Sequence, residues 1–425
     1  MKKIVLTASF LALFGNFTKA QKLNSTEKKI VDYINQQMPQ TEQLLKKIVN
    51  INSGTMNTEG VREVGGILRK EFDEIGFKTE WISLPDSLNR AGHLVAERKG
   101  NQGKKVFLIG HLDTVFEKAM TFTPYTYLND STVTGQGVND MKGGDIVLLA
   151  ALKALHQNGL LENTSLTAYF TGDEESAGRP TSISRKDFIE RAQKNEIALA
   201  FETAVNLNTV ATARRGASGW KLNVKGVMGH SSTIFSQQAG YGAIYEAARI
   251  LNEFREKLST EKYLTFNPGL IMGGSEINNN NETIGKDNII SPRVMVSGDL
   301  RFLTETQKEN ARLKMKEIVA QSLNKTKAEI VFSDGIPAME PTPQNEQLLA
   351  VVNKVSLDLG FGEVKAGDPG SRGAGDISYI AKYVACLDGL GASGKGAHAP
   401  GETMNIKEFP KLVQRTALLI YRLTR

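Results

Sequence analysis

Apolar residues recur at two spacings in the first half of the chain. Between Thr58 and Ile75 they fall every three or four positions, which predicts an amphipathic helix ended by Gly76. The same spacing predicts a helix over Lys142–Gln157. Uninterrupted apolar runs predict three buried strands, at Lys104–Gly110, Leu166–Phe170 and Ile197–Phe201. Strands that alternate with helices favour an α/β fold with a mostly parallel sheet and helices on both faces.

The pattern changes in the middle of the chain. Trp220–Val224 alternates apolar and polar residues, which is typical of a strand with one exposed face. Helices over Tyr241–Leu258 and Gln307–Leu323 and strands over Tyr263–Met272 and Arg293–Phe302 follow. They predict an inserted α+β domain with an antiparallel sheet at residues 214–325. The α/β domain then has two parts, residues 21–213 and 326–425, and the second part is expected to begin with a strand at Glu329–Phe332.

The first twenty residues differ from the rest. Lys2 and Lys3 precede the apolar run Ile4–Phe14, and Thr18 and Ala20 are small residues before a cleavage point. This pattern predicts a signal peptide at residues 1–20 and an exported protein, periplasmic or secreted; a buried N-terminal helix is the alternative. The run is too short to span a bilayer, and no other segment approaches about 18 apolar residues.

Charge and cysteine content exclude several classes. The formal charge of +6 falls to 49 − 46 = +3 without residues 1–20, which hold three lysines and no acid. Basic and acidic residues are interspersed, so no basic stripe indicates a nucleic-acid partner. A single cysteine, Cys386, excludes an internal disulfide and cysteine-based metal clusters. It lies in the apolar run Tyr383–Leu387 and is expected in the core.

Acidic residues and histidines gather in five short motifs, mostly where predicted strands end. They are GHLDTV (110–115), GVNDMKGG (137–144), TGDEESAG (171–178), FET (201–203) and GAHAPGE (396–402). In open α/β sheets, ligands bind beyond the carboxyl ends of the strands. Histidines and carboxylates without cysteine suit a pair of zinc ions bound through nitrogen and oxygen. A shared carboxylate would place a bridging water where it can attack a carbonyl.

Neighbouring residues within these motifs suggest separate roles. Residues two apart on an extended backbone point the same way, so His111 is a candidate ligand whose ring Asp113 orients. Glu174 and Glu175 are adjacent and diverge, so one can bind metal while the other faces the attacking water. Asp140 stands at the start of a helix, where an ordinary N-cap is the alternative interpretation.

Together the five motifs resemble those of the two-zinc aminoacylase/carboxypeptidase metallopeptidases. This family includes glutamate carboxypeptidase, acetylornithine deacetylase and succinyl-diaminopimelate desuccinylase, and the resemblance is closest to the glutamate carboxypeptidase branch. The resemblance implies two Zn²⁺ per subunit, with Co²⁺ or Mn²⁺ as substitutes. It places His111 and Glu202 on one ion, Glu175 and His398 on the other, and Asp140 between them.

The resemblance also implies catalytic roles. Glu174 would be the general base, Asp113 the orienter of His111, and the Asp140–Met141 peptide bond would be cis. Residues 21–213 and 326–425 would then form the catalytic domain.

Residues 214–325 resemble the family's lid, which also forms a homodimer contact. The lid residue His230 would polarise the scissile carbonyl, in its own subunit or in the partner. Asn288 and Arg301 would contact the substrate carboxylate, although a strand-edge ion pair is an alternative for Arg301. Backbone N–H groups at Gly373 and Gly375 would face the same anion.

The expected activity is cleavage of the C-terminal amide bond of a peptide or N-acyl amino acid, by a metal-bridging water activated by Glu174. The glutamate carboxypeptidase branch has an arginine before the Pro-Ala pair that follows the lid. Ile336 stands there in this chain, which leaves a preference for glutamate open. Two alternatives remain: an N-acyl amino acid deacylase with the same zinc centre, and a catalytically inactive periplasmic relative that only binds ligands.

Overall fold

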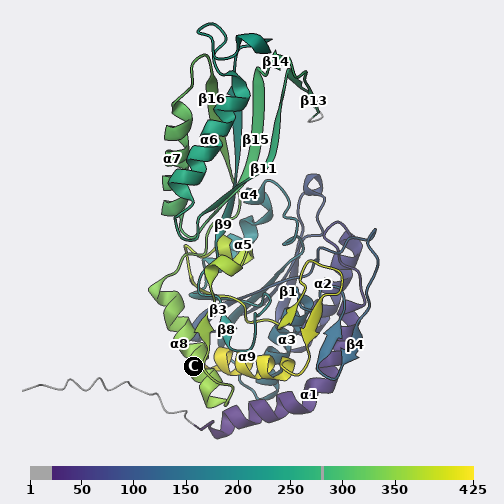
Figure 1. The fold of residues 1–425 in the computed structure, drawn as a ribbon. Coiled ribbons are helices and arrows are strands. Elements are labelled where there is room, and N and C mark those ends of the chain that lie inside the picture. The colour runs from purple at the N-terminus through teal and green to yellow at the C-terminus, as the bar shows by residue number, and fades with distance from the viewer. Residues whose placement is uncertain (1–21, 279–281) are drawn as a thin grey trace, which may run out of the picture.

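The computed structural model describes residues 22–278 and 282–425. The predicted signal peptide therefore lies outside the described residues. Figure 1 shows a larger α/β unit and, beyond it, a smaller unit in which two helices lie along one sheet. Within the described part of the chain, no helix is long and apolar enough to cross a bilayer.

A six-stranded sheet forms the centre of the larger unit, in the order β1-β2-β6-β3-β7-β18. Its strands are β1 (Lys78–Ile82), β2 (His93–Arg98), β3 (Gln102–His111), β6 (Thr164–Thr171), β7 (Ile197–Ala200) and β18 (Ala385–Leu387). The pairs β3–β6, β3–β7 and β7–β18 are parallel, whereas β1–β2 and β2–β6 are antiparallel. The mostly parallel sheet is thus confirmed, and the three strands predicted from apolar runs lie at its centre.

Side chains from both faces of this sheet are buried. Val106 and Leu108 point into a core shared with the helices α1 (Ser25–Val49), α2 (Thr58–Glu74), α3 (Lys142–Gln157), α8 (Pro343–Asp358) and α9 (Phe409–Leu423). Phe107 and Ile109 point the other way, toward α5 (Lys186–Ala192) and the buried Cys386. This two-sided burial explains why the strands read as unbroken apolar runs.

The smaller unit contains the lid sheet, in the antiparallel order β11-β15-β9-β16. Its strands are β9 (Gly216–Lys225), β11 (Thr265–Gly274), β15 (Arg293–Phe302) and β16 (Lys327–Asp334). The helices α6 (Gly242–Leu258) and α7 (Glu305–Ala320) share a core with one face of this sheet. The α+β architecture with an antiparallel sheet is therefore confirmed.

One strand belongs to a different sheet than expected. The sequence prediction opens the second α/β part with Glu329–Phe332, whereas β16 pairs along its whole length with β9 of the lid sheet. Ala328, Ile330 and Phe332 pack against the lid core, and the residues between them are more exposed. This alternation is the signature of a one-sided antiparallel strand, not of a buried parallel one.

Short elements complete the fold. A small sheet has the order β19-β20-β5-β4, and two-residue ladders join β10 to β14, β12 to β13 and β8 to β17. Their bounds are β4 (Thr126–Asn129), β5 (Thr132–Thr134), β8 (Thr209–Val210), β10 (Gly229–His230), β12 (Glu276–Ile277), β13 (Thr283–Ile284), β14 (Ile289–Ile290), β17 (Lys365–Ala366), β19 (Gly394–Lys395) and β20 (Thr403–Asn405). The short helix α4 spans Thr181–Ser184.

Candidate metal centre

The five candidate ligands come together at the carboxyl edge of the central sheet. His111 is the last residue of β3, Glu175 follows β6, and Glu202 follows β7. Asp140 precedes α3, and His398 lies in the loop between β19 and β20. Because β3, β6 and β7 are parallel, their carboxyl ends meet at one edge, as the sequence argument required.

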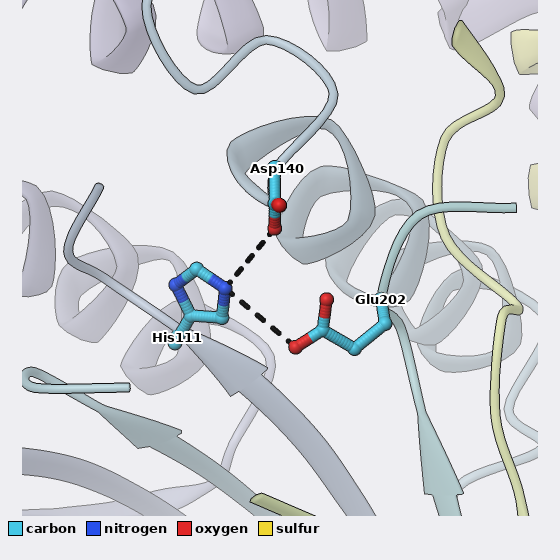
Figure 2. Close-up of side chains that lie close together, drawn as sticks. All are labelled: His111, Asp140 and Glu202. Atoms are coloured by element: carbon cyan, nitrogen blue, oxygen red, sulfur yellow. Dashed lines mark ion pairs between the residues drawn. The ribbon is translucent and has the colours of Figure 1, made fainter. Parts of the chain in front are cut away.

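The first ligand group is buried. His111 Nε2 lies 3.3 Å from Asp140 Oδ1 and 3.7 Å from Glu202 Oε1, as Figure 2 shows. Ligands at 2.0–2.2 Å from a tetrahedral zinc are about 3.3–3.6 Å apart, so these separations suit an ion. His111 Nε2 is also buried without a hydrogen-bond partner among the described residues. Buried polar atoms nearly always have a partner, so the unpaired Nε2 fits a nitrogen that binds a metal ion.

The second group shares Asp140 with the first. His398 Nε2 lies 3.1 Å from Asp140 Oδ2 and 3.1 Å from Glu175 Oε2. The other Glu175 oxygen, Oε1, is buried and has no hydrogen-bond partner in the described part of the chain. Each oxygen of Asp140 therefore faces one group, as in a carboxylate that bridges two ions. The His398 side chain is 60% exposed, against 2% for His111.

Asp113 holds several parts of this centre together. His111 Nδ1 lies 3.0 Å from the Asp113 carbonyl and 3.5 Å from its carboxylate, so the shorter contact is with the backbone. A proton on Nδ1 leaves Nε2 free to bind a metal. The Asp113 carboxylate accepts the backbone N–H groups of Glu174 (3.0 Å) and Glu175 (3.1 Å) and the Thr55 hydroxyl (2.6 Å). Asp113 thus fixes the His111 ring and the loop that carries both glutamates.

The loop that carries Asp140 is held by a residue that the sequence argument missed. The Glu402 carboxylate accepts N–H groups of Gly137 (3.0 Å), Asn139 (2.7 Å) and Asp140 (2.8 Å). The predicted cis bond at Asp140–Met141 is present, and Met141, not Asp140, caps α3. Glu402 stands in the GAHAPGE motif, but nothing in the sequence indicates a partner 262 residues earlier.

A charged network buried behind the centre was also missed. Arg185 is fully buried; its Nη1 lies 2.5 Å from Asp173 Oδ1 and its Nε 2.7 Å from Asp376 Oδ1. Asp376 also accepts the Thr171 hydroxyl at 2.7 Å. The network ties the loop before Glu174 to the chain after the glycine-rich segment. Arginines and aspartates are common, so no spacing in the sequence points to it.

The electrostatics show an excess of negative charge. Burial raises the pKa of Glu174 well above its usual range, and the charge of Glu202 raises it further. Burial, and then the charge of Asp140, raises the pKa of Glu202 to about 7. Burial alone would lower the pKa of His111, but the nearby carboxylates of Asp113 and Asp140 raise it well above its ordinary value. Divalent cations would relieve this crowding of carboxylates.

The structure places His230 and Asn288 elsewhere. Both are exposed where β10 pairs with β14, at the far end of the lid sheet in Figure 1, and the Asn288 carbonyl accepts the Ser231 N–H at 2.9 Å. Arg301 lies at the near end of that sheet, opposite Ala217. The eight residue steps of β9 from Ala217 to its end at Lys225 span about 26 Å at 3.3 Å per residue. The centre of this chain is therefore assembled without His230 and Asn288.

The other predicted substrate contacts have protein partners in this structure. Arg301 Nε lies 2.7 Å from Asp299 Oδ2, the ion pair considered as the alternative. The Gly373 and Ala374 carbonyls accept bonds from Arg214 at 2.7 and 3.2 Å. A side chain at Gly375 would come within 2.5 Å of Arg214 Nη1, so the close approach of this arginine accounts for that glycine. An anion cradle at Gly373 and Gly375 stays a prediction.

Comparison with known proteins gives the family. A model described as peptidase family M20/M25/M40 matches residues 107–422. The chain belongs to this family. Carboxypeptidase G2 of Pseudomonas sp. (strain RS-16) is 26% identical over 389 residues, which cover 90% of this chain and 89% of that protein. Succinyl-diaminopimelate desuccinylase of Pelagibacter ubique (strain HTCC1062) is 23% identical over 384 residues, 87% of this chain and 95% of that protein.

Solved structures of other proteins share the fold. Aminopeptidase PepT of Bacillus cereus superposes with a TM-score of 0.74 at 16% identity, over 94% of this chain and 99% of that one. The YXEP protein of Bacillus subtilis, described as a dinuclear metal-binding peptidase, gives 0.65 at 14% identity, over 92% and 99%. Membership confirms the resemblance and the expected class, so this chain is a hydrolase of family M20/M25/M40 with two candidate groups of metal ligands.

Proposed function

We propose that this hydrolase is a di-zinc carboxypeptidase, which cleaves the C-terminal amide bond of a peptide or N-acyl amino acid. The observation that carries the proposal is the pair of ligand groups joined through Asp140, with Glu174 in neither group but close enough for its charge to act on His111. The carboxypeptidase and desuccinylase relatives support amide hydrolysis.

The donor set fits zinc. His111 and Glu202 would hold one ion, Glu175 and His398 the other, and Asp140 both; Co²⁺ or Mn²⁺ would substitute. Bound at this centre, the ions would polarise the scissile carbonyl and make water acidic enough to ionise near neutral pH.

Glu174 is the proposed general base. It would take a proton from the attacking water and pass it to the nitrogen of the departing amine. A carboxylate whose pKa is raised by burial is a better proton acceptor than an ordinary glutamate, which supports this role. Its backbone N–H bond to Asp113 keeps the side chain at the centre.

We further propose that His230 and Asn288 act in trans within a homodimer formed through the lid. Exposed apolar side chains gather on α6, β11, β13 and nearby turns: Met228, Phe235, Tyr241, Ile244, Tyr245, Leu270, Ile271 and Ile284. β11 is also an edge strand, and exposed apolar patches and open edges favour association. His230 Nδ1 accepts the Ser232 N–H at 3.3 Å, so Nε2–H would donate to the carbonyl oxygen as charge develops.

Export is proposed from the sequence of residues 1–20. A mature protein that begins at Gln21 would be periplasmic or secreted, and N-terminal sequencing of the protein from its native host tests this directly.

A second candidate activity, removal of a small acyl group from an N-acyl amino acid, is supported by the desuccinylase relative. Both activities use the same centre, and a substrate panel on the zinc-loaded protein separates them. A carboxypeptidase tolerates varied acyl parts and discriminates the C-terminal residue, whereas a deacylase does the reverse. If the metal-replete protein turned over no member of the panel, both proposed activities would fail.

A further inference from the structure

Arg372 lies beside the metal centre with few partners of its own. It follows the turn Pro369–Ser371, and its Nη2 donates to the Thr203 carbonyl at 2.6 Å, one residue beyond the ligand Glu202. Its Nη1 lies where a side chain at Gly389 would stand, 2.7 Å from the position of a Cβ there. The guanidinium is therefore fixed between two backbone segments at the edge of the centre.

The carboxylate that could neutralise Arg372 is already engaged. Both Asp388 oxygens are used, Oδ2 by Arg214 Nη1 at 2.5 Å and Oδ1 by the Gly389 N–H at 2.5 Å. Among residues 22–278 and 282–425, no carboxylate lies within ion-pair distance of Arg372. A guanidinium has five N–H donors, and the described residues engage those of Nη2 alone.

Arg372 and Arg214, which both lie near Asp388, differ in the direction of their pKa shifts. Burial lowers the pKa of Arg372, and the charge of Arg214 lowers it further. Burial alone would lower the pKa of Arg214, but the charges of Asp388, Glu202 and Glu174 and the hydrogen bond to Asp388 together raise it. Arg214 is thus a satisfied structural cation, whereas Arg372 is a partly desolvated cation that lacks a counterion.

We propose that Arg372 binds a carboxylate of the amino acid that the enzyme releases. The unused Nη1 N–H donors can form a charge-assisted hydrogen bond with a carboxylate oxygen, an interaction by which arginine recognises carboxylates. This inference rests on the proposed function and deepens it, because it supplies a basic contact in a chain where Ile336 stands in place of an arginine. The carboxylate is either the α-carboxylate or an acidic side chain.

The test compares three ligands in wild type, Arg372→Gln and Arg372→Lys. The ligands are N-benzoyl-glutamate, N-benzoyl-glutamine, which keeps the α-carboxylate alone, and N-benzoyl-glutamate α-amide, which keeps the side-chain carboxylate alone. Arg255→Gln, an exposed lid arginine paired with Glu256, controls for the change in net charge. Turnover by the zinc-loaded enzymes gives kcat/KM, and calorimetric binding is repeated in a Glu174→Gln background, where turnover does not interfere.

We expect Arg372→Gln to weaken glutamate binding and kcat/KM about 10- to 100-fold, the range for a lost hydrogen bond to a charged group. The loss should vanish for whichever ligand lacks the carboxylate that Arg372 binds, and Arg372→Lys should recover part of it. Metal content should stay at the wild-type level. An equal loss on all three ligands, or no loss, would overturn the inference. If wild type hydrolysed none of them, the proposed function would fail, while the binding titration would still decide the role of Arg372.

Discussion

The metal centre and the tip of the lid are built in opposite ways. At the centre, residues from β3, β6, β7, the start of α3 and the loop before β20 meet in one chain, and most are buried. At the tip, at the far end of the lid sheet, His230 is exposed in the two-residue strand β10, and Asn288 is exposed directly before β14. A buried centre needs its partners within the fold, whereas an exposed tip can serve a neighbouring subunit. Under the proposed trans arrangement, one chain would suffice to bind metal, and two would be needed to complete catalysis.

The centre side of this comparison is tested most strongly by Glu174→Gln. The amide keeps the shape but cannot accept a proton, so kcat should fall about 10²- to 10⁴-fold while metal content stays unchanged. Steady-state kinetics and metal analysis measure both, with the surface residue variant Glu196→Gln as a control. Near wild-type turnover would remove Glu174 from the role of base.

The tip side is tested by mixing two inactive proteins. His230→Ala alone should lose about 10²- to 10³-fold in kcat, as expected when an oxyanion donor is removed. Refolded with Glu174→Gln, it should regain about a quarter of wild-type activity, because half of the dimers are mixed and each has one intact site. Activity that stays near zero after exchange of subunits would place His230 in its own chain's site.

The buried ion pairs of Arg185 predict that its replacement lowers the free energy of unfolding strongly. Arg185→Met leaves Asp173 and Asp376 buried without their cation and should cost about 3–5 kcal/mol in the free energy of unfolding. The exposed lid variant Arg255→Met should change it by less than about 0.5 kcal/mol. Urea denaturation of both proteins gives the two values. Similar midpoints and slopes would show that the buried network contributes little.

Removal of the metal ions should make the stability of the folded protein depend on pH, because the carboxylates at the centre then lack a neutralising charge. The raised pKa of Glu202, about 7 in the folded protein against about 4.5 unfolded, means that the folded state binds more protons between these values. Its contribution to stability is therefore present below about pH 4.5 and lost as the pH rises through 7. Melting temperatures of the chelated protein should fall over this range, and those of the zinc-loaded protein should fall less. If the melting temperatures of the two proteins fell equally with pH, the pH dependence would not originate from carboxylates at the metal site.

The sequence predicted those features that follow from a local pattern of apolar and polar residues. The apolar runs around Leu108, Ala168 and Leu199 predicted the central strands, and the helical spacing of Lys142–Gln157 predicted α3 with its observed bounds. The motifs at the strand ends brought the ligands to one edge. The fold and the meeting of these side chains at one edge could thus be predicted from the sequence.

Contacts between residues of common types that lie far apart in the sequence could not be predicted. Glu402, Arg185 and Arg372 each act through partners far away in the sequence, and nothing local marks them. Strand β16 was assigned to the wrong sheet, although the alternation of Ala328, Ile330 and Phe332 already indicated a one-sided strand. Which strands pair depends on tertiary packing, which a pattern in one segment does not specify.

The metal stoichiometry of three variants tests the central claim most directly. Because Asp140 faces both ligand groups, the account predicts two zinc ions per wild-type chain, one in His111→Ala and in His398→Ala, and none held tightly in Asp140→Ala. Metal analysis after dialysis, with circular dichroism to verify folding, measures all four proteins. A folded Asp140→Ala protein that kept two ions would contradict a centre joined through this carboxylate.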